Sequence, residues 1–250
     1  MSGHSKWATI KRKKGKNDAE RGRLFTKLIK EITVAAREGG GNPESNPRLR
    51  HAIDKAKEGS MPAENIERAV KRGTGELEGV SYEEVVYEGY APGGIAILAE
   101  ALTDNRNRTV SDIRHIFSRN GGNLAETGTV AWVFENKGVI SVEKSAASED
   151  EVFMAALDAG ADDIDSEGDT HEITTAPGDL DKVRKALEAA EIKVASADLS
   201  RVPTNTVKVE GKQAEQVLRL VEALEEHEDI QKVYGNFEMD EKLMAELAEA

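Results

Sequence analysis

The first third of the chain carries apolar residues at the spacing of amphipathic helices. From residue 18 to residue 37 they fall on one helical face, and three glycines follow. Asn46 and the proline after it predict the start of a second helix, which runs to residue 58. A third helix is predicted over residues 62–72, before a glycine. These three helices predict a small helical domain.

After residue 80 the pattern changes to short strand-like runs separated by short amphipathic helices. Pro92-Gly93-Gly94 indicates a tight turn between the first two strands. The predicted strands cover residues 85–90, 95–102, 130–134, 139–142, 172–175, 192–197, 206–209 and 230–238, with one short strand at Ile164. The predicted helices cover residues 110–119, 149–159, 179–190 and 212–227, with a short terminal helix over 240–250.

The order of these elements predicts two nested domains. Residues 138–200 read strand, helix, two strands, helix, strand, which is the order of a ferredoxin-like unit. Removing them leaves the same order, with strands at 94–102, 129–134, 205–210 and 230–238. We therefore predict an α+β protein with three domains, and one large sheet is the alternative. The domains are a basic helical domain (1–76), a discontinuous ferredoxin-like α/β domain (77–136 and 204–250) and an inserted ferredoxin-like α/β domain (137–203).

Charge is distributed unevenly along the chain, whose net charge is −13. Residues 1–75 hold 18 Lys/Arg and 9 Asp/Glu, a net charge of +9, whereas residues 76–250 hold 16 and 38, a net charge of −22. Such asymmetry favours a polyanion as the partner of the basic part. The acidic remainder would repel a polyanion, so we expect the contact to be confined to one end.

Several classes of protein are excluded by what the sequence lacks. It has no cysteine, which excludes a disulfide framework and any thiolate site. No apolar run reaches the roughly 18 residues of a membrane span, and no apolar segment follows the basic N-terminus as in a secretory signal. The five histidines lack metal-ligand spacing, and no nucleotide-binding or nucleophile motif is present. We therefore predict a cytoplasmic protein with no catalytic residue, metal or cofactor.

The basic N-terminal region is the leading candidate for a binding site. Lys and Arg neutralise phosphates and release counterions, and a Trp among them can stack on a base. The alternative is a solubilising arm and helix face, with Trp7 as a packing residue. The predicted nucleic-acid contacts are Lys6, Trp7, Lys11, Arg12, Lys13, Lys14, Lys16, Arg21, Arg23, Lys27, Lys30, Arg48, Arg50, Lys71 and Arg72.

A second polar cluster lies between a predicted strand and the helix that follows it. The cluster consists of Asp104, Asn105, Arg106, Asn107 and Arg108. Its arginines could hold a phosphate or a partner at the helix N-terminus, and its Asp and Asn side chains could bind a metal. The alternative is a capped turn, in which Asp104, Asn107 or Thr109 satisfies the helix amides.

Several short motifs, spread over most of the chain, resemble those of the YebC/PmpR family. In the helical part they are Gly3-His4-Ser5-Lys6-Trp7, Phe25-Thr26-Lys27-Leu28-Ile29, Gly39-Gly40-Gly41-Asn42-Pro43, Asn46-Pro47-Arg48-Leu49-Arg50, and Met61-Pro62 followed by Asn65-Ile66. Further along they are Tyr87-Glu88-Gly89-Tyr90-Ala91-Pro92-Gly93-Gly94, Leu102-Thr103-Asp104-Asn105-Arg106-Asn107-Arg108-Thr109 and Gly121-Gly122-Asn123-Leu124.

The resemblance implies three domains, a cytoplasmic location and no catalytic residues. Members of this family are described as probable transcriptional regulators that bind DNA. Its mitochondrial relatives are translational activators, and bacterial members have been connected with ribosomes and stalled translation. Two hypotheses follow: a DNA-binding transcriptional regulator, or a translation factor that binds RNA or the ribosome. An enzyme centred on Asp104 and Asn105 is a third. The sequence indicates neither a target sequence nor an oligomeric state.

Overall fold

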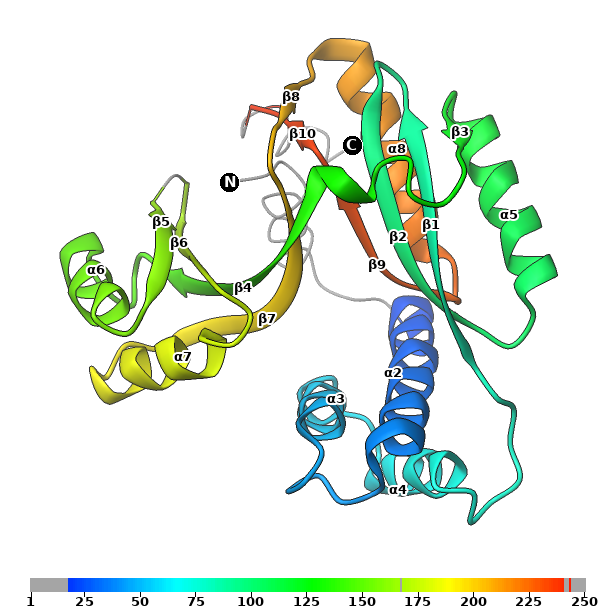
Figure 1. The fold of residues 1–250 in the computed structure, drawn as a ribbon, viewed down its shortest axis with the longest axis horizontal. Helices are drawn as coiled ribbons and strands as arrows, with labels where there is room; N and C mark the ends of the chain where they lie inside the picture. The colour runs from blue at the N-terminus through cyan, green and yellow to red at the C-terminus, as the bar shows by residue number, and fades with distance from the viewer. Residues whose placement is uncertain (1–17, 167, 241–242, 244–250) are drawn as a thin grey trace. The chain divides into compact units, whose positions relative to one another are not determined.

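The computed structural model describes residues 18–166, 168–240 and 243 (Figure 1). These residues form two compact units. We call residues 18–129 with 211–233 the first unit, and residues 130–210 with 234–240 the second unit. In the parts of the chain that are described, no helix is long and apolar enough to cross a membrane.

Three helices open the first unit: α2 (Asp18–Gly39), α3 (Pro47–Glu58) and α4 (Ala63–Gly73). Their fully buried side chains include Ile32, Leu49 and Ala69, one from each helix. At Gly73 a Cβ atom would lie 2.4 Å from the carbonyl oxygen of Thr33, so α4 can end against α2 only because this residue is glycine. The three helices predicted from periodicity are confirmed.

Asn46 fixes the connection between α2 and α3. Its side-chain oxygen accepts a hydrogen bond from the Leu49 amide and so caps α3. Its Nδ2 group donates to the carbonyl oxygens of Ala35, at 2.7 Å, and Gly40, at 2.9 Å, near the end of α2. One buried side chain therefore satisfies backbone groups at both helix ends.

An antiparallel hairpin forms the centre of the first unit's sheet. Strands β1 (Glu83–Ala91) and β2 (Ile95–Thr103) pair over nine residues each. The turn between them needs positive φ at Gly93 (84°) and Gly94 (76°), which glycine adopts without strain. The full strand order is β3-β1-β2-β9, with β3 at Asn123–Leu124 and β9 at Ile230–Gly235.

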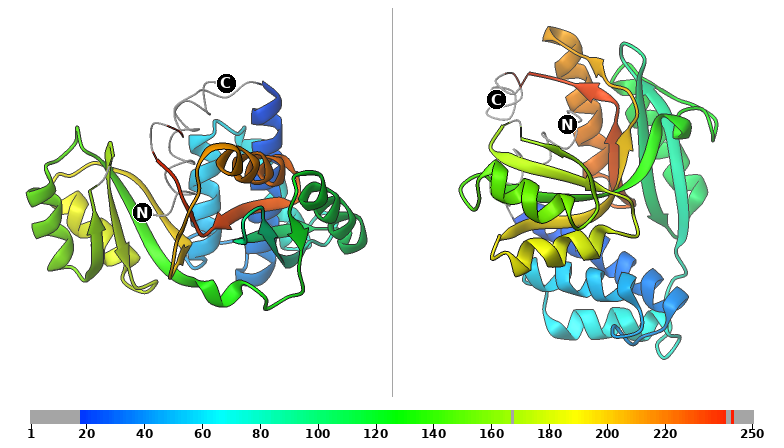
Figure 2. Two further views of the ribbon diagram at one scale, coloured as in Figure 1. Left: turned by 90° about the horizontal axis from the view of Figure 1, so that it is seen from above. Right: turned by 60° about the vertical axis from the view of Figure 1, so that its left-hand side comes forward.

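Helices α5 (Arg106–Arg119) and α8 (Gly211–Glu226) contact each other, and both contact β1 (Figures 1 and 2). Phe117 of α5 is fully buried, and its ring occupies the space that a side chain at Gly89 would need. Helix α5 begins one turn earlier than the pattern predicted, because Asn105 caps it.

The prediction of which strands complete this sheet is wrong. Residues 131–133 form a short 3-10 helix, η1 (Ala131–Val133), rather than a strand. Strand β8 (Val207–Lys208) pairs with β10 (Phe237–Glu238) in a separate two-stranded sheet of the second unit. Strand β1 occupies the place between β2 and β3 instead. A hairpin closed by a short turn costs little loop entropy, which favours this local pairing over a distant one.

The second unit contains a second antiparallel sheet. Its elements follow the order β4 (Phe134–Glu143), α6 (Glu149–Leu157), β5 (Ala161–Asp165), β6 (Thr170–Thr175), α7 (Leu180–Ala189) and β7 (Val194–Pro203). The strand order is β5-β6-β4-β7, and the sequence order is the one predicted for residues 138–200. Helices α6 and α7 contact each other and the sheet (Figure 2). The core between these helices and the sheet includes Ile140, Ile173 and Leu187. The fold is thus three helices followed by two antiparallel sheets with helices.

Replacing Asn46 with Ala should lower the free energy of unfolding by about 1–3 kcal/mol, because the α3 cap is lost and two carbonyl groups lose their donor. Asn46→Ser keeps a capping oxygen but loses the amide donors, so its cost should be smaller. Urea titration followed by circular dichroism measures both. Asn42→Ala, at an exposed position in the same loop, is the control. Equal costs for Asn46→Ala and Asn42→Ala would contradict this account.

Candidate nucleic-acid interface

The most basic segment of the chain lies outside the described residues. Residues 1–17 hold six Lys/Arg and no Asp/Glu, whereas residues 18–75 hold 12 and 9. The structure therefore leaves the role of this segment a prediction. The predicted contacts in it are Lys6, Trp7, Lys11, Arg12, Lys13, Lys14 and Lys16.

The basic face of α2 is directed at the end of α8 and the start of β9, within the first unit. Lys27 Nζ donates to the carbonyl oxygen of Glu225, and Arg23 lies 3.7 Å from the Glu226 carboxylate. Lys30 is buried, and its Nζ lies 2.5 Å from Asp229 Oδ1. Contrary to the prediction, Lys30 is not available to a phosphate, because its charge is used inside the molecule.

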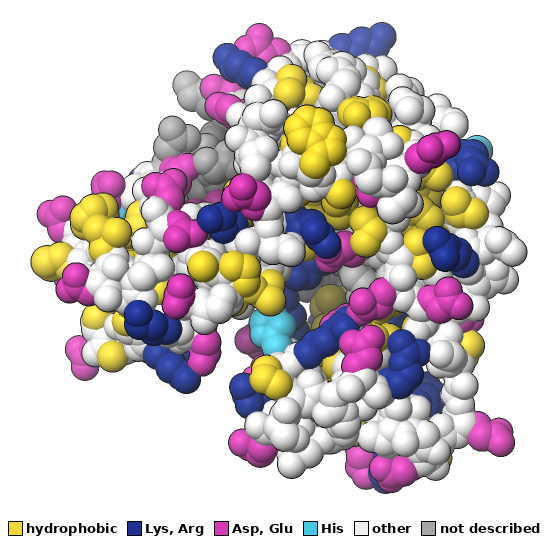
Figure 3. Space-filling view, in the orientation of Figure 1, with side chains coloured by type: hydrophobic (Ala, Val, Ile, Leu, Met, Phe, Trp, Pro, Cys, Tyr) yellow, Lys and Arg dark blue, Asp and Glu magenta, His cyan; other side chains and the backbone are white. Residues whose placement is uncertain are grey.

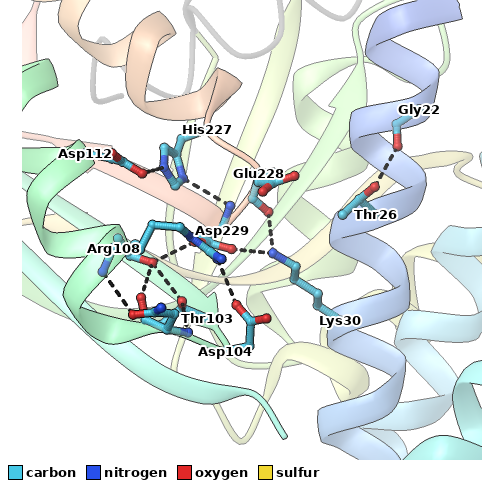
Figure 4. Close-up of polar contacts among 12 residues, drawn as sticks. Gly22, Thr26, Lys30, Thr103, Asp104, Arg108, Asp112, His227, Glu228 and Asp229 are labelled. Atoms are coloured by element: carbon cyan, nitrogen blue, oxygen red, sulfur yellow. Dashed lines mark hydrogen bonds and ion pairs between the residues drawn. The ribbon is translucent and has the colours of Figure 1, made fainter. Parts of the chain in front are cut away.

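Asp229 is the centre of this contact (Figure 4). Its carboxylate is fully buried, with a side-chain exposure of 0%. It accepts hydrogen bonds from Lys30, from Thr109 Oγ1 at 2.7 Å and from Arg108 Nη2 at 3.1 Å. Its backbone carbonyl accepts from the amide of Leu102 at 2.8 Å. One carboxylate thus ties together α2, β2, α5 and the start of β9.

The surroundings of Asp229 keep it ionised. Burial by itself raises the pKa of this carboxyl. The hydrogen bonds from Lys30 and Thr109, the charge of Lys30 and the hydrogen bond from Arg108 lower it by more, so the pKa falls to about 2. At neutral pH the site therefore holds one buried anion between two cations.

Most of the polar cluster before α5 is explained by the same contact. Asn105 caps the helix by accepting from the Arg108 amide at 3.1 Å, so the predicted capped turn is present with a different capping residue. Arg108 also lies 2.8 Å from Asp104. In the parts of the chain that the structure describes, no three His, Asp or Glu residues converge as metal ligands.

Arg106 and Asn107 do not take part in this contact. Both line a cavity of about 370 Å³ between β1, α5 and residues 124–127, together with Arg114 and Tyr87. The Tyr87 hydroxyl is buried and has no hydrogen-bond partner among the described residues. This cavity is the place where the cluster could still meet a ligand.

Arg48 forms a second cluster of ion pairs inside the first unit. It lies within 2.7 Å of carboxylates of Glu31 and Glu38 on α2, and 2.5 Å from Glu84 on β1. Partial burial alone would lower its pKa, but the hydrogen bonds that Arg48 donates to Glu31 and Glu84, and the charges of those carboxylates, raise the pKa above its ordinary value. Arg48 therefore holds the helices to the sheet, and its charge is neutralised by three carboxylates. The predicted phosphate contact at this residue does not fit that environment.

The other predicted contacts stay on the surface. Lys71 pairs with Glu67 at 2.7 Å on the same helix. Arg21, Arg50 and Arg72 are exposed, and none of them lies within 4.0 Å of a carboxylate among the residues that the structure describes. On the face drawn in Figure 3, Lys and Arg side chains of the helical region alternate with Asp and Glu. The described part of the helical region therefore has no continuous basic patch on this face.

The sequence reading missed Trp132 of η1, whose exposed fraction is 70%. The sequence pattern predicts a strand over residues 130–134, and this prediction does not indicate that the Trp132 side chain is exposed. An exposed indole can stack on an unpaired base, so Trp132 joins the candidate site residues.

These observations define the class of the protein: it is an α+β chain with three N-terminal helices followed by two antiparallel sheets with helices. The family described as the TACO1/YebC protein N-terminal domain matches residues 5–76, and that described as the TACO1/YebC second and third domain matches residues 82–237. The chain belongs to the TACO1/YebC family. This confirms the resemblance drawn from its motifs.

Relatives from several bacteria bear the name probable transcriptional regulatory protein. One from Pelotomaculum thermopropionicum is 61% identical, over 96% of this chain and 100% of its own. Another from Desulfotalea psychrophila is 57% identical over 100% of both chains. The crystal structure of the conserved hypothetical protein Aq1575 from Aquifex aeolicus matches with a TM-score of 0.82 at 49% identity, covering 91% of this chain and 95% of that one.

Replacing Asp229 with Asn should destabilise the protein by about 3–5 kcal/mol at pH 7, because the buried Lys30 loses its anion and the exposed Arg108 loses one of its two carboxylate partners. The loss should depend on pH. The folded protein holds the pKa of Asp229 at about 2, below its ordinary 3.8. Between those two pH values the unfolded chain therefore binds more protons than the folded protein. The ionised Asp229 contributes about 2 kcal/mol to the free energy of unfolding above pH 5, and this contribution is lost as the pH falls toward 2.

The measurement is the difference in unfolding free energy between the wild type and Asp229→Asn, taken by urea titration from pH 7 to the lowest pH at which both fold. That difference should shrink as the pH falls. Asp112→Asn is the control, since this half-exposed carboxylate lies 3.4 Å from His227 at the edge of the same cluster. A difference that stays constant with pH would show that the Asp229 charge does not stabilise the fold.

Proposed function

We propose that this protein is a non-enzymatic, cytoplasmic regulator of gene expression that binds nucleic acid mainly through residues 1–17. One observation carries the proposal. Cations of the helical region have partners inside the first unit, namely Arg23, Lys27 and Lys30 of α2 and Arg48 of α3, which pair with carboxylates or a carbonyl. Residues 1–17, in contrast, contribute six cations and no anion. Cations that contact a polyanion release its counterions, which supplies affinity. The name of the relatives supports a role in regulation.

The proposed contacts have different tasks. Lys11, Arg12 and their neighbours to Lys16 bind phosphates, and so position the protein without reading sequence. Exposed Arg21, Arg50 and Arg72 extend that surface. Trp7 and Trp132 stack on unpaired bases where the target has them. No cofactor takes part.

We propose DNA as the first target, because the relatives are named as transcriptional regulators. RNA, free or in the ribosome, is the second candidate. Two observations favour it: the net charge of −22 over residues 76–250 fits poorly along a duplex, and the exposed indole of Trp132 suits single strands. The two targets are distinguished by direct comparison of affinity at one salt concentration.

We also propose the three-domain organisation with boundaries at 1–76, 77–136 with 204–250, and 137–203, of which the last is ferredoxin-like. The strand order β5-β6-β4-β7 supports this for the inserted domain. The helical domain is the basic one, and the two sheet domains supply shape and partner surfaces.

Replacing Lys11, Arg12, Lys13, Lys14 and Lys16 with Gln should weaken binding to every sequence by a similar factor. The slope of log K against log salt should flatten by up to about 4.5 for duplex and about 3.5 for single strands. The matched control removes five exposed lysines elsewhere, Lys144, Lys182, Lys185, Lys193 and Lys212, and so changes the net charge equally. Titrations use duplex DNA, single-stranded DNA and structured RNA. An unchanged slope in the N-terminal variant, or equal flattening in the control, would exclude this segment as the phosphate contact.

Trp132→Ala should lower affinity for single strands by about 1–3 kcal/mol and leave duplex binding nearly unchanged, because only unpaired bases offer a face for stacking. Trp132→Phe should retain part of the affinity. The unfolding free energy should not fall appreciably in either variant, since the side chain is 70% exposed. Equal losses on duplex and single strand would speak against stacking.

A further inference from the structure

Helix α6 of the second unit exposes apolar side chains that its own fold does not use. Val152 and Ala156 face the core and are fully buried. Phe153, Met154 and Leu157 are 50%, 67% and 41% exposed. These are three of the eight large hydrophobic residues exposed in the described chain, gathered on one helix of nine residues. A concentration of this kind marks an interaction surface rather than scattered surface residues.

A hollow of about 520 Å³ lies beside these side chains. It is bordered by Met154 and Ala155 of α6, by Ala147 in the segment before α6, and by Ile192 after α7. Apolar side chains therefore form part of its lining, beside Glu151 and Glu191, and a flexible methionine lies at its edge. Methionine adapts its shape to different apolar groups, which suits a docking surface. The hollow and the exposed face of α6 form one continuous surface, which we call the α6 surface.

Glu191 at the rim of the hollow adopts a backbone conformation that a glutamate rarely adopts. Its φ is +61°, in the left-handed region. It follows the last turn of α7, a position where glycine is usual because glycine has no Cβ to strain. Strain of this kind lowers stability and is found most often at functional sites. The fold thus keeps a carboxylate where an uncharged glycine would be more stable.

The segment that carries the α6 surface is strongly acidic. Residues 149–169 contain nine Asp/Glu and no Lys/Arg. Over α6, hydrophobic side chains lie beside Asp and Glu side chains at the left of Figure 3. An apolar surface with an acidic rim repels nucleic acid and a second α6, and it complements an apolar segment flanked by cations.

We propose that the α6 surface is a docking site for a basic amphipathic segment of a partner protein, separate from the nucleic-acid contact. The partner places apolar side chains on Phe153, Met154 and Leu157 and in the hollow, and its Lys or Arg side chains reach Glu151 and Glu191. Both carboxylates line the hollow. The small area available makes this a weak and reversible contact.

The test uses the isotopically labelled full-length protein and three synthetic peptides of about 14 residues. The probe is an amphipathic helix of Lys and Leu. One control peptide replaces its Lys with Glu, and the other replaces its Leu with Ser. We expect saturable binding of the Lys/Leu peptide alone, with NMR shift changes confined to α6, residues 146–147 and residues 190–192. Equal binding of either control peptide, or shift changes elsewhere, would overturn the proposal.

Variants separate docking from folding. Met154→Glu should lower the affinity for the Lys/Leu peptide by about tenfold or more, because it puts a charge on the apolar face. Glu191→Gly should also lower the affinity while raising the thermal stability, since it removes both the rim charge and the strained φ. A purely structural role of Glu191 predicts no loss of binding. Leu199→Ser, at an exposed apolar residue on β7 outside the surface, is the control.

Two further outcomes identify other occupants and would overturn the proposal. A dimer of the wild type that dissociates in Met154→Glu would assign the surface to a second copy of the chain. Loss of nucleic-acid affinity in Met154→Glu would assign it to nucleic acid. If the peptide result fails while the salt slope of the N-terminal variant behaves as expected, only the docking site is lost, and the proposed function stands.

Discussion

The buried carboxylate of Asp229 is the constraint on which the first unit depends. It lies between the ammonium group of Lys30 and the guanidinium of Arg108, and it accepts a third hydrogen bond from Thr109 (Figure 4). A buried charge is tolerated only when it is paired and hydrogen-bonded. Helix α2, the cap of α5 and the start of β9 must therefore sit in one arrangement for any of them to be satisfied.

This constraint also determines which cations remain for a ligand. Lysines and arginines on α2 that resemble a nucleic-acid-binding stripe are directed at α8 and β9, and Arg48 is held by three carboxylates. A count of basic residues overstates the charge that a partner can reach. In the sequence, the excess of cations is concentrated in the first 17 residues, and residues 76–250 carry a net negative charge.

Local signals were sufficient to predict much of this fold. Asn46 with its following proline predicted the start of α3, and Pro92-Gly93-Gly94 predicted the β1–β2 hairpin. The errors arose where a partner lies far along the chain. The anion that buries Lys30 is 199 residues away, and no periodicity in α2 reveals it. Trp132 was misplaced because a run of apolar residues around it looks the same in a strand as in η1.

The separation between Lys30 and Asp229 has a consequence for the order in which the chain can fold. The sheet β5-β6-β4-β7 comes from one continuous stretch, residues 134–203, so all its strands are present once that stretch has been synthesised. The first unit must wait for β9, its last strand, because domains fold as their segments become available and distant contacts form slowly. During synthesis this sheet is thus complete while Lys30 still lacks its counter-ion, and the older part of the polypeptide is the last to reach its native state.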